Sequence, residues 1–232
     1  MEIQFPFEII SDRPFHEYTL EDILEGQVFK VDKPLTWSSF QVVNKIKHAI
    51  KKKFKVKKFK IGHAGTLDPL ASGLLIICTG KKTKEIPLFQ DQSKEYTGVI
   101  RLGGTTPSYD LETEVDVVFP IDHIKPEQIN QVLEQFKGDI FQYPPVFSAV
   151  KIDGRRAYKS ARKGVEVEVK LRQVTIHDIE IDAQNFPDIA FRVHCSKGTY
   201  IRSLAFDFGS ALNSGGHLVA LRRTKIGQFS LI

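Results

Sequence analysis

The 232-residue sequence contains two cysteines, one methionine and one tryptophan, and it lacks long apolar runs. Its longest unbroken apolar run, LLIIC at 74–78, is far shorter than a membrane-spanning helix requires. The N-terminal stretch MEIQFPFEII is acidic and aromatic, without the basic start and apolar core of a signal peptide. We therefore expect a cytoplasmic protein that makes no contact with a membrane.

Motifs for several common cofactors are also missing. TGKKT at 79–83 lacks the Ser or Thr and the second Gly that a phosphate-binding loop requires, and no G-x-S-x-G occurs. DLETEVD at 110–116 lacks the glycine and final glutamate of a calcium loop, so an exposed strand face or loop is expected there. Cys78 and Cys195 lie in apolar or strand-like stretches away from metal-ligand spacings, which predicts reduced core thiols. We expect no cofactor, metal or disulfide.

Acidic residues are absent from one long stretch of this basic chain. Between Lys33 and Leu67 there are ten lysines and no Asp or Glu, while the whole chain has a net charge of +5. The densest part is KKKFKVKKFK at 51–60. Two interpretations stay open, a solvated face and a face that binds a polyanion. Phe54 and Phe59 interrupt the lysines, which is typical of a folded element.

Among the features that are present, hydrophobic periodicity predicts both helices and strands. A hydrophobic content of 41% supports a well-filled core, and no repeat or low-complexity linker divides the chain, so one domain over 1–232 is expected. Strands are predicted at 27–34, 74–80, 96–104 and 165–181, helices at 38–54 and 126–138, and a strand followed by a helix at 191–212. This mixture predicts an α+β fold with a largely antiparallel central sheet flanked by helices and loops.

The helix at 38–54 carries the clearest local pattern. Ser38 and Gln41 have the spacing of a capping box. The apolar residues Phe40, Val43, Ile46 and Ile50 predict the buried stripe, which leaves the lysines exposed.

One carboxylate stands alone in an apolar segment. HAGTLDPLASGLL at 63–75 contains Asp68, which is followed by Pro69 and bracketed by Gly65 and Gly73. An Asp before Pro commonly begins a turn or a helix, so the simplest interpretation is structural. The segment is nevertheless too hydrophobic for a solvated loop, which keeps a functional carboxylate as the alternative.

Six blocks, taken together and in order, resemble the TruB family of tRNA pseudouridine synthases over roughly residues 27–229. They are DKP (32–34), GHAGTLDPLASGLL (62–75), KEYTGVIRLG (94–103), PPVFSAVKIDGRRAYKSARKG (144–164), CSKGTYIRSL (195–204) and GHLVALRRTKIG (216–227). The resemblance implies the pseudouridine synthase fold and isomerisation of uridine 55 in the T loop of tRNA, without cofactor or metal. It also implies tRNA, through its T-stem-loop, as the partner; no protein partner is implied and a monomer is expected.

The resemblance assigns catalytic roles to three residues. Asp68 falls on the catalytic aspartate, Tyr96 on the tyrosine that stacks on the target base, and Arg202 on the arginine that pairs with the aspartate. A glycoside hydrolase commonly needs two carboxylates, one of which activates water or attacks. A base that leaves and is recaptured by the same sugar needs only one, in a dry pocket. Whether Asp68 attacks the sugar or acts as a base stays open.

Four further residues match substrate-binding positions of the family. His63 matches the histidine that helps to open the T loop, and Tyr200 and Leu221 match residues that line the uridine pocket. Lys33 lies in a motif near the active site, with its role left open. The structural alternatives are a turn histidine, a half-buried strand tyrosine at position 96 and a structural ion pair for Arg202.

The expected RNA-backbone contacts are basic, because phosphate contacts supply much of the affinity for nucleic acids. They are Lys52, Lys53, Lys55 and Lys57, with Arg155 and Arg156 in an RNA-gripping insertion at about 139–165. The sequence ends soon after the last block, so we expect no C-terminal PUA-type domain. Two rival functions stay open: a non-enzymatic RNA-binding module, and a synthase of this fold that acts on another RNA.

Overall fold

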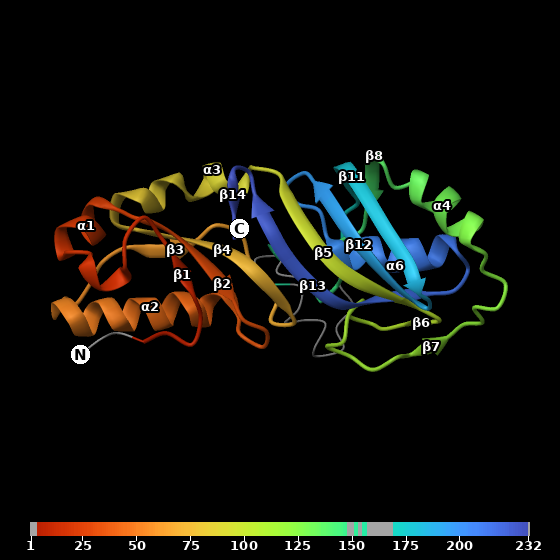
Figure 1. Ribbon diagram of the computed structural model, residues 1–232, viewed down its shortest axis with the longest axis horizontal. Coiled ribbons are helices and arrows are strands. Elements are labelled where there is room, and N and C mark those ends of the chain that lie inside the picture. The colour runs from red at the N-terminus through yellow and green to blue at the C-terminus, as the bar shows by residue number, and fades with distance from the viewer. Residues whose placement is uncertain (1–3, 148–150, 153–154, 157–168, 232) are drawn as a thin grey trace. The chain divides into compact units, whose positions relative to one another are not determined.

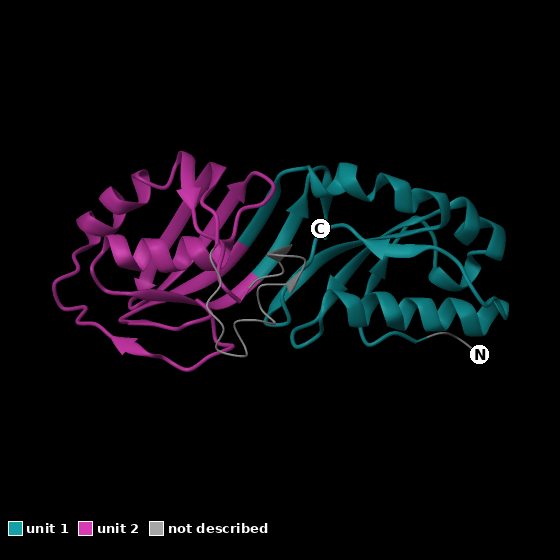
Figure 2. Cartoon of the chain, turned by 180° about the vertical axis from the view of Figure 1, so that it is seen from behind, with its two compact units in different colours: residues 1–96, 222–232 teal, residues 97–221 magenta. Residues whose placement is uncertain are grey.

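The computed structural model describes residues 4–147, 151–152, 155–156 and 169–231. It divides the chain into two compact units, unit 1 with Met1–Tyr96 and Arg222–Ile232, and unit 2 with Thr97–Leu221 (Figure 2). The strand pairs described below are antiparallel and are accompanied by helices, so the predicted α+β class with a largely antiparallel sheet is confirmed.

Unit 1 combines short strands with three α-helices (Figure 1). Its strands are β1 (Ile9–Ile10), β2 (Val28–Lys33), β3 (Ile61–His63), β4 (Ala71–Thr79), the start of β5 (Lys94–Leu102), the end of β13 (Gly216–Ile226) and β14 (Phe229–Ser230). Its helices are η1 (Phe15–Glu17), α1 (Leu20–Glu25), α2 (Ser39–Phe54), η2 (Gly80–Glu85) and α3 (Ile86–Gln90). The strand order is β1-β2-β4-β13, with β3 also paired to β4.

Helices cover both faces of this sheet, with α2 along one side of β2 and β4 and α3 on the other (Figure 1). On the α2 side, Ile46 and Ile50 pack with Phe29, Leu75 and Ile77. On the α3 side, a second apolar cluster contains Leu74, Ile76, Cys78 and Phe89. Burial on both faces explains why β4 is an almost continuous apolar run instead of an alternating one.

Helix α2 begins as the sequence predicts. Ser38 is the N-cap, its side chain accepts from the Gln41 backbone, and the Gln41 side chain accepts from the Ser38 backbone, so the capping box is confirmed. The predicted buried stripe is wrong at one position, because Phe40 is 67% exposed. Val42 occupies the core in its place, since it lies one turn before Ile46 on the buried face.

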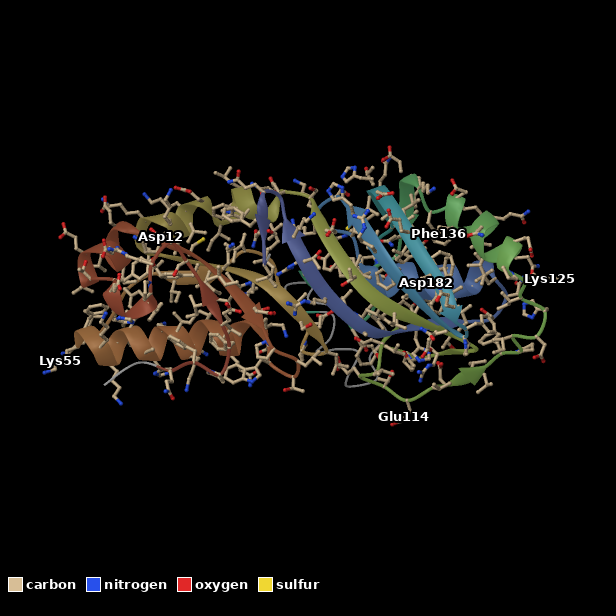
Figure 3. The ribbon with its side chains drawn as sticks, in the orientation of Figure 1. Asp12, Lys55, Glu114, Lys125, Phe136 and Asp182 are labelled. Atoms are coloured by element: carbon tan, nitrogen blue, oxygen red, sulfur yellow. The ribbon has the colours of Figure 1, made fainter. Side chains whose placement is uncertain are left out.

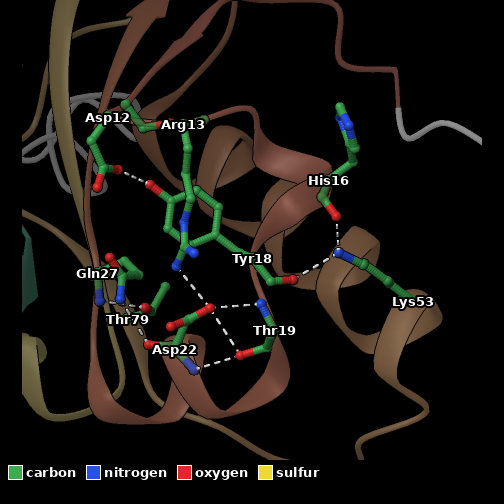
Figure 4. Close-up of polar contacts among 10 residues, drawn as sticks. Asp12, Arg13, His16, Tyr18, Thr19, Asp22, Gln27, Lys53 and Thr79 are labelled. Atoms are coloured by element: carbon green, nitrogen blue, oxygen red, sulfur yellow. Dashed lines mark hydrogen bonds and ion pairs between the residues drawn. The ribbon is translucent and has the colours of Figure 1, made fainter.

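The N-terminal segment packs against the C-terminal end of α2 (Figure 4). Lys53 Nζ donates to the carbonyl oxygens of His16 (2.6 Å) and Tyr18 (2.8 Å). Tyr18 donates to Asp12, and Arg13 lies over the Tyr18 ring and pairs with Asp22. These contacts make Lys53 part of the fold of unit 1.

Unit 2 is built around long antiparallel strands. Its strands are the remainder of β5, β6 (Gly104–Thr105), β7 (Val117–Val118), β8 (Gly138–Gln142), β9 (Lys151–Ile152), β10 (Arg155–Arg156), β11 (Arg172–Asn185), β12 (Asp188–Cys195) and the start of β13. The helices among its described residues are α4 (Pro126–Glu134) and α6 (Ile201–Ala211). The strand order is β13-β5-β12-β11-β8.

The strand predicted at 165–181 is shifted in the structure. Residues 165–168 lie outside the described residues, and β11 continues to Asn185 because its end pairs with the start of β12, with Asn185 opposite Asp188. The residues at the end of β11 are polar, so the alternation of apolar residues did not predict this extension. The segment 110–116 is a loop as expected, except that Asp110 is buried.

Both cysteines are free and buried, which confirms the prediction of core thiols. Among the described residues, no helix is long and apolar enough to cross a membrane. Within those same parts of the chain, no group of His, Cys, Asp and Glu has a metal-binding arrangement. The single catalytic domain and its insertion at about 139–165 stay predictions, and 148–150, 153–154 and 157–165 of that insertion lie outside the described residues.

Candidate active site

Asp68 lies in unit 1, in the connection between β3 and β4. The Ala71 backbone N–H donates to the Asp68 carbonyl oxygen at 3.1 Å, so Asp68 begins a tight turn. The structural interpretation is therefore right for the backbone. Asp68 is half-buried.

Two sets of hydrogen bonds tie this turn to the segment that precedes α2. The Thr36 N–H donates to the Pro69 carbonyl oxygen at 2.8 Å. The buried Ser39 hydroxyl accepts from the Leu67 N–H at 2.9 Å and donates to the Leu67 carbonyl oxygen at 3.1 Å. Both neighbours of Asp68 are thus held by protein groups, so its position is fixed by the start of α2.

The segment before α2 is itself strained. Thr36 has φ of 69°, a left-handed conformation that is unfavourable for a β-branched residue. Such strain persists only where surrounding contacts enforce it, and it is common at functional sites. The bond from Thr36 to Pro69 is the contact that holds it beside the Asp68 turn.

Arg223, on β13, makes hydrogen bonds to residues on both sides of the Asp68 turn. Its side chain is 1% exposed, with Nε donating to the Leu74 carbonyl oxygen at 2.8 Å and Nη2 to the Gly65 carbonyl oxygen at 3.2 Å. Gly73 has φ of 104°, and a Cβ there would lie 2.3 Å from the Arg223 carbonyl oxygen. Only glycine allows β4 and β13 to approach this closely.

Lys33 brings a second buried cation to this region. Its side chain is fully buried, and Nζ donates to the carbonyl oxygens of Pro34 (3.0 Å) and Trp37 (2.6 Å). Burial lowers the pKa of Lys33 to about 8, the negative charge of Asp68 acts against this lowering, and the Arg223 cation adds to it. Asp68 and Lys33 therefore lie close enough for their charges to interact within unit 1.

The structure places Tyr96 and His63 on strands of the same unit. Tyr96 is a buried residue of β5, and His63 is a half-buried residue at the end of β3. Next to Tyr96, Glu95 accepts a hydrogen bond from Thr224 at 2.8 Å and pairs with Lys225 at 3.4 Å. These contacts anchor β5 to β13 beside Tyr96. The stacking and loop-opening roles of Tyr96 and His63 stay predictions.

Arg202 lies in unit 2, near the start of α6, and its guanidinium group is held in place. Nη1 donates to the Ser108 carbonyl oxygen at 3.1 Å and Nη2 to the Phe147 carbonyl oxygen at 3.0 Å. Nε is 3.6 Å from Asp110 Oδ2, and the two side chains are only 5% and 8% exposed. The predicted pair of Asp68 and Arg202 joins residues of the two units and stays a prediction.

Asp110 and Arg223 were not assigned roles from the sequence. The burial of Asp110 could not be predicted, because it belongs to an acidic segment whose other residues are mostly exposed and no periodic pattern marks it as buried. The sequence could have predicted that one of these two arginines points inward, because Arg222 and Arg223 are adjacent in a strand and adjacent side chains point to opposite faces. Arg222 pairs with Asp32 in a two-bond arrangement at 2.9 and 2.6 Å, while Arg223 points inward.

The residues predicted to line the uridine pocket lie in unit 2. Tyr200 is the N-cap of α6, where its backbone N–H donates to the buried Gln142 side chain at 3.1 Å. Gln142 also donates to the Tyr200 carbonyl oxygen, so β8 fixes the start of the helix that carries Arg202. Leu221 is a half-buried residue of β13. The contacts of both with a uridine stay predictions.

The predicted RNA-backbone residues divide into two kinds. Lys52, Lys55 and Lys57 are exposed, with Lys55 at the C-terminal end of α2 (Figure 3). Lys53 is also exposed, but its Nζ donates to the N-terminal segment, as described above. Arg155 and Arg156 form β10, but their side chains lie outside the described residues.

Comparisons with known proteins match most of the chain. The family described as TruB family pseudouridylate synthase (N terminal domain) matches residues 51–201. The tRNA pseudouridine synthase B of Flavobacterium johnsoniae is 60% identical over 214 residues, which cover 92% of this chain and 93% of that protein. That of Parabacteroides distasonis is 54% identical over 210 residues, covering 90% and 89%.

A solved structure is also similar. A chain of the structure described as a Cbf5-Nop10-Gar1 complex has a TM-score of 0.67 and 32% sequence identity, covering 98% of this chain. This chain spans 57% of the length of that one.

Proposed function

Because this chain belongs to the TruB family of pseudouridylate synthases, we propose that it isomerises uridine 55 in the T loop of tRNA, with Asp68 as the catalytic carboxylate. Membership of the family, with relatives named tRNA pseudouridine synthase B, makes it an RNA uridine isomerase that acts on tRNA. The position in tRNA and the roles of the residues are the content of the proposal.

The observation that carries the proposal is the environment of Asp68. The reaction breaks the bond from uracil N1 to ribose C1′, turns the base and joins C5 to the same C1′, while C5 loses a proton and N1 gains one. The sugar centre needs one group of negative charge in a fixed place. Asp68 begins a turn held on both sides, and the charges of Lys33 and Asp68 act on each other. A preorganised carboxylate of this kind suits a developing positive charge on the ribose.

The remaining assigned residues bind and orient the substrate. Tyr96 offers an aromatic face to the extruded base, which replaces the stacking lost on flipping. Arg202, immobilised by two carbonyl oxygens, pairs with Asp68 and keeps it ionised. His63 fills the place that the base leaves, and Tyr200 and Leu221 line the pocket that receives the uridine.

The same proposal covers partners and location. The T-stem-loop of tRNA is bound chiefly through phosphate contacts by exposed lysines at the C-terminal end of α2. The protein acts as a monomer in the cytoplasm, where tRNA is modified.

Mapping pseudouridine in tRNA after incubation with the purified protein tests this function. A tRNA transcript should acquire one pseudouridine at position 55, and a transcript with cytidine at that position should acquire none. Modification at another position, or only of another RNA, would favour a synthase with a different substrate. Tight tRNA binding without modification would favour the non-enzymatic RNA-binding module.

A further inference from the structure

We propose that the solvent face of α2 is part of the RNA-binding surface, in which Phe40 stacks on an unpaired base next to the Asp68 turn. The lysines farther along the same face bind the phosphates of that RNA. This inference rests on the proposed function and adds to it a stacking residue at the end of the lysine-rich face.

Three large apolar side chains are exposed around the Asp68 turn. Phe40 is 67% exposed, Leu35 55% and Leu70 39%. A single exposed apolar residue needs no explanation, whereas a group of them beside a functional site marks a binding surface. The other large apolar residues of α2 pack into the core. Phe40 is exposed although the same helix has an apolar core beside it.

The backbone holds these three residues near one another within unit 1. Leu35 precedes Thr36, whose N–H donates to Pro69, and Leu70 follows Pro69. Phe40 follows Ser39, whose hydroxyl exchanges two hydrogen bonds with Leu67. Each exposed apolar residue is therefore adjacent in sequence to a bond that joins the start of α2 to the Asp68 turn. We call this group the Phe40 patch.

The Phe40 patch continues into a row of cations along α2. In a helix, residues three or four apart share a face. The row next to the buried stripe consists of the exposed Phe40 and the half-buried Asn44, Lys47 and Lys51. The neighbouring row, on the side away from the core, consists of the exposed Gln41, Lys45, His48 and Lys52, and Lys55 follows as the C-cap of the helix. A helix of 16 residues is about 24 Å long, so the lysines at its end reach well beyond the Asp68 turn.

The positive charge of the solvent face of α2 indicates which kind of partner it binds. No acidic residue occurs between Lys33 and Leu67, so the whole of α2 and the segment before it is free of negative charge. Proteins that bind single-stranded nucleic acid combine such a positive track with aromatic side chains on which bases stack. An RNA that has been opened at its target base presents both phosphates and unstacked bases. RNA is therefore the occupant that matches the lysines and Phe40 together.

The test compares three variants at one position with a matched control. Phe40→Ala should weaken tRNA binding by about fivefold to 150-fold, the range that corresponds to the loss of one base–aromatic stack. Phe40→Trp should bind like the wild type, and Phe40→Leu should bind like Phe40→Ala, because it is apolar but cannot stack. Leu88→Ala, which removes a 65% exposed side chain from α3, should leave binding unchanged.

A salt titration gives a second readout. Loss of stacking releases no counterions, so Phe40→Ala should lower affinity without changing the slope of log affinity against log salt. A thermal melt of each variant should match the wild type, since the exposed ring contributes little to the core.

Equal tRNA affinity of the wild type and Phe40→Ala would overturn the inference, as would full affinity of Phe40→Leu. If sedimentation shows a wild-type dimer that Phe40→Ala dissociates while tRNA binding is unchanged, the patch joins two copies and the inference is also overturned. A Phe40-dependent affinity in a protein that forms no pseudouridine would support this surface and refute the proposed function.

Discussion

At the level of single residues, both neighbours of Asp68 are bonded to the segment that begins α2. Leu67 is bonded through both its N–H and its carbonyl oxygen to Ser39, and Pro69 accepts from Thr36. A catalytic group must be held within a fraction of an ångström of its working geometry. The start of α2 supplies that support, so substitutions there should affect the rate through Asp68.

Arg202→Lys should lower the rate of pseudouridine formation by at least about a hundredfold, because an ammonium group cannot replace the planar donors. In the wild type these donors hold Ser108 and Phe147 while Nε lies near Asp110. Arg101→Lys is the matched control, since Arg101 forms an exposed two-bond pair with Asp188. Single-turnover kinetics with both variants separate a site-specific loss from a general cost of replacing arginine. A normal rate for Arg202→Lys would refute its role.

Lys33 makes stability depend on pH in the alkaline range. Its pKa is about 8 in the folded protein and near 10.5 when unfolded, so the unfolded state binds more protons between these values. The Lys33 contribution to the free energy of unfolding should therefore rise from pH 8 to 10.5 and be constant below pH 8. Denaturant unfolding of the wild type and Lys33→Met across this range checks it. A difference between the two proteins that does not change with pH would contradict the lowered pKa.

The sequence could predict which residues are chemically unusual but not all that surround them. Asp68 was noticed as a lone acid in an apolar segment, and its catalytic role was assigned only through the family resemblance, because an Asp before Pro commonly has a structural role. Asp110 was not noticed, because its neighbours are acidic and exposed, and its burial results from a contact with Arg202, more than 90 positions away. Phe40 was assigned to the core because helical spacing alone cannot distinguish Phe40 from Val42 at the edge of the stripe.

At the level of elements, α2 has a structural role at its start and a proposed RNA-binding role at its end. Its start holds the Asp68 turn, and its last turn places three lysines near the C-terminal end of the helix dipole, which favours cations. The capping box was predictable because its geometry is local. The full length of β11 was not, because its last residues are polar although their backbone pairs with β12.

Substitution of two adjacent lysines of α2 should affect different properties, stability for Lys53 and tRNA binding for Lys52. Lys53→Gln should lower the free energy of unfolding by about 1 kcal/mol, because it removes two hydrogen bonds to the N-terminal segment. Lys52→Gln should leave stability unchanged and weaken tRNA binding, since Lys52 is exposed on the proposed RNA-binding face. Urea unfolding and tRNA titration of the two variants provide the comparison. Equal stability of the two would mean that the Lys53 contacts contribute nothing.

At the level of the whole molecule, the assigned residues are divided between two units. Lys33, His63, Asp68 and Tyr96 belong to unit 1, and Tyr200, Arg202 and Leu221 belong to unit 2. The division could not be predicted, because it falls inside β5 and β13 where no linker, repeat or change in composition occurs. Strands shared by two units leave no mark in a sequence pattern.

The exposed lysines at the end of α2 should determine the salt dependence of RNA binding. Replacing Lys52, Lys55 and Lys57 by Gln should weaken tRNA binding and reduce the slope against log salt by up to about three, because each lost phosphate contact releases one counterion fewer. A control with Lys84, Lys125 and Lys137 replaced by Gln has the same net charge and alters lysines that are also exposed. Identical slopes for the two variants would show that net charge, and not this face, governs binding.

The most direct test of the account is a comparison of the wild type with Asp68→Asn on a tRNA labelled with tritium at C5 of uridine, with release of tritium measured as the bond to C5 forms. Asparagine keeps the shape of the side chain and removes its charge. We expect the wild type to release tritium from position 55 and Asp68→Asn to release none, while binding tRNA with nearly unchanged affinity. Release of tritium by Asp68→Asn at a measurable fraction of the wild-type rate would contradict the assignment of Asp68 as the catalytic carboxylate.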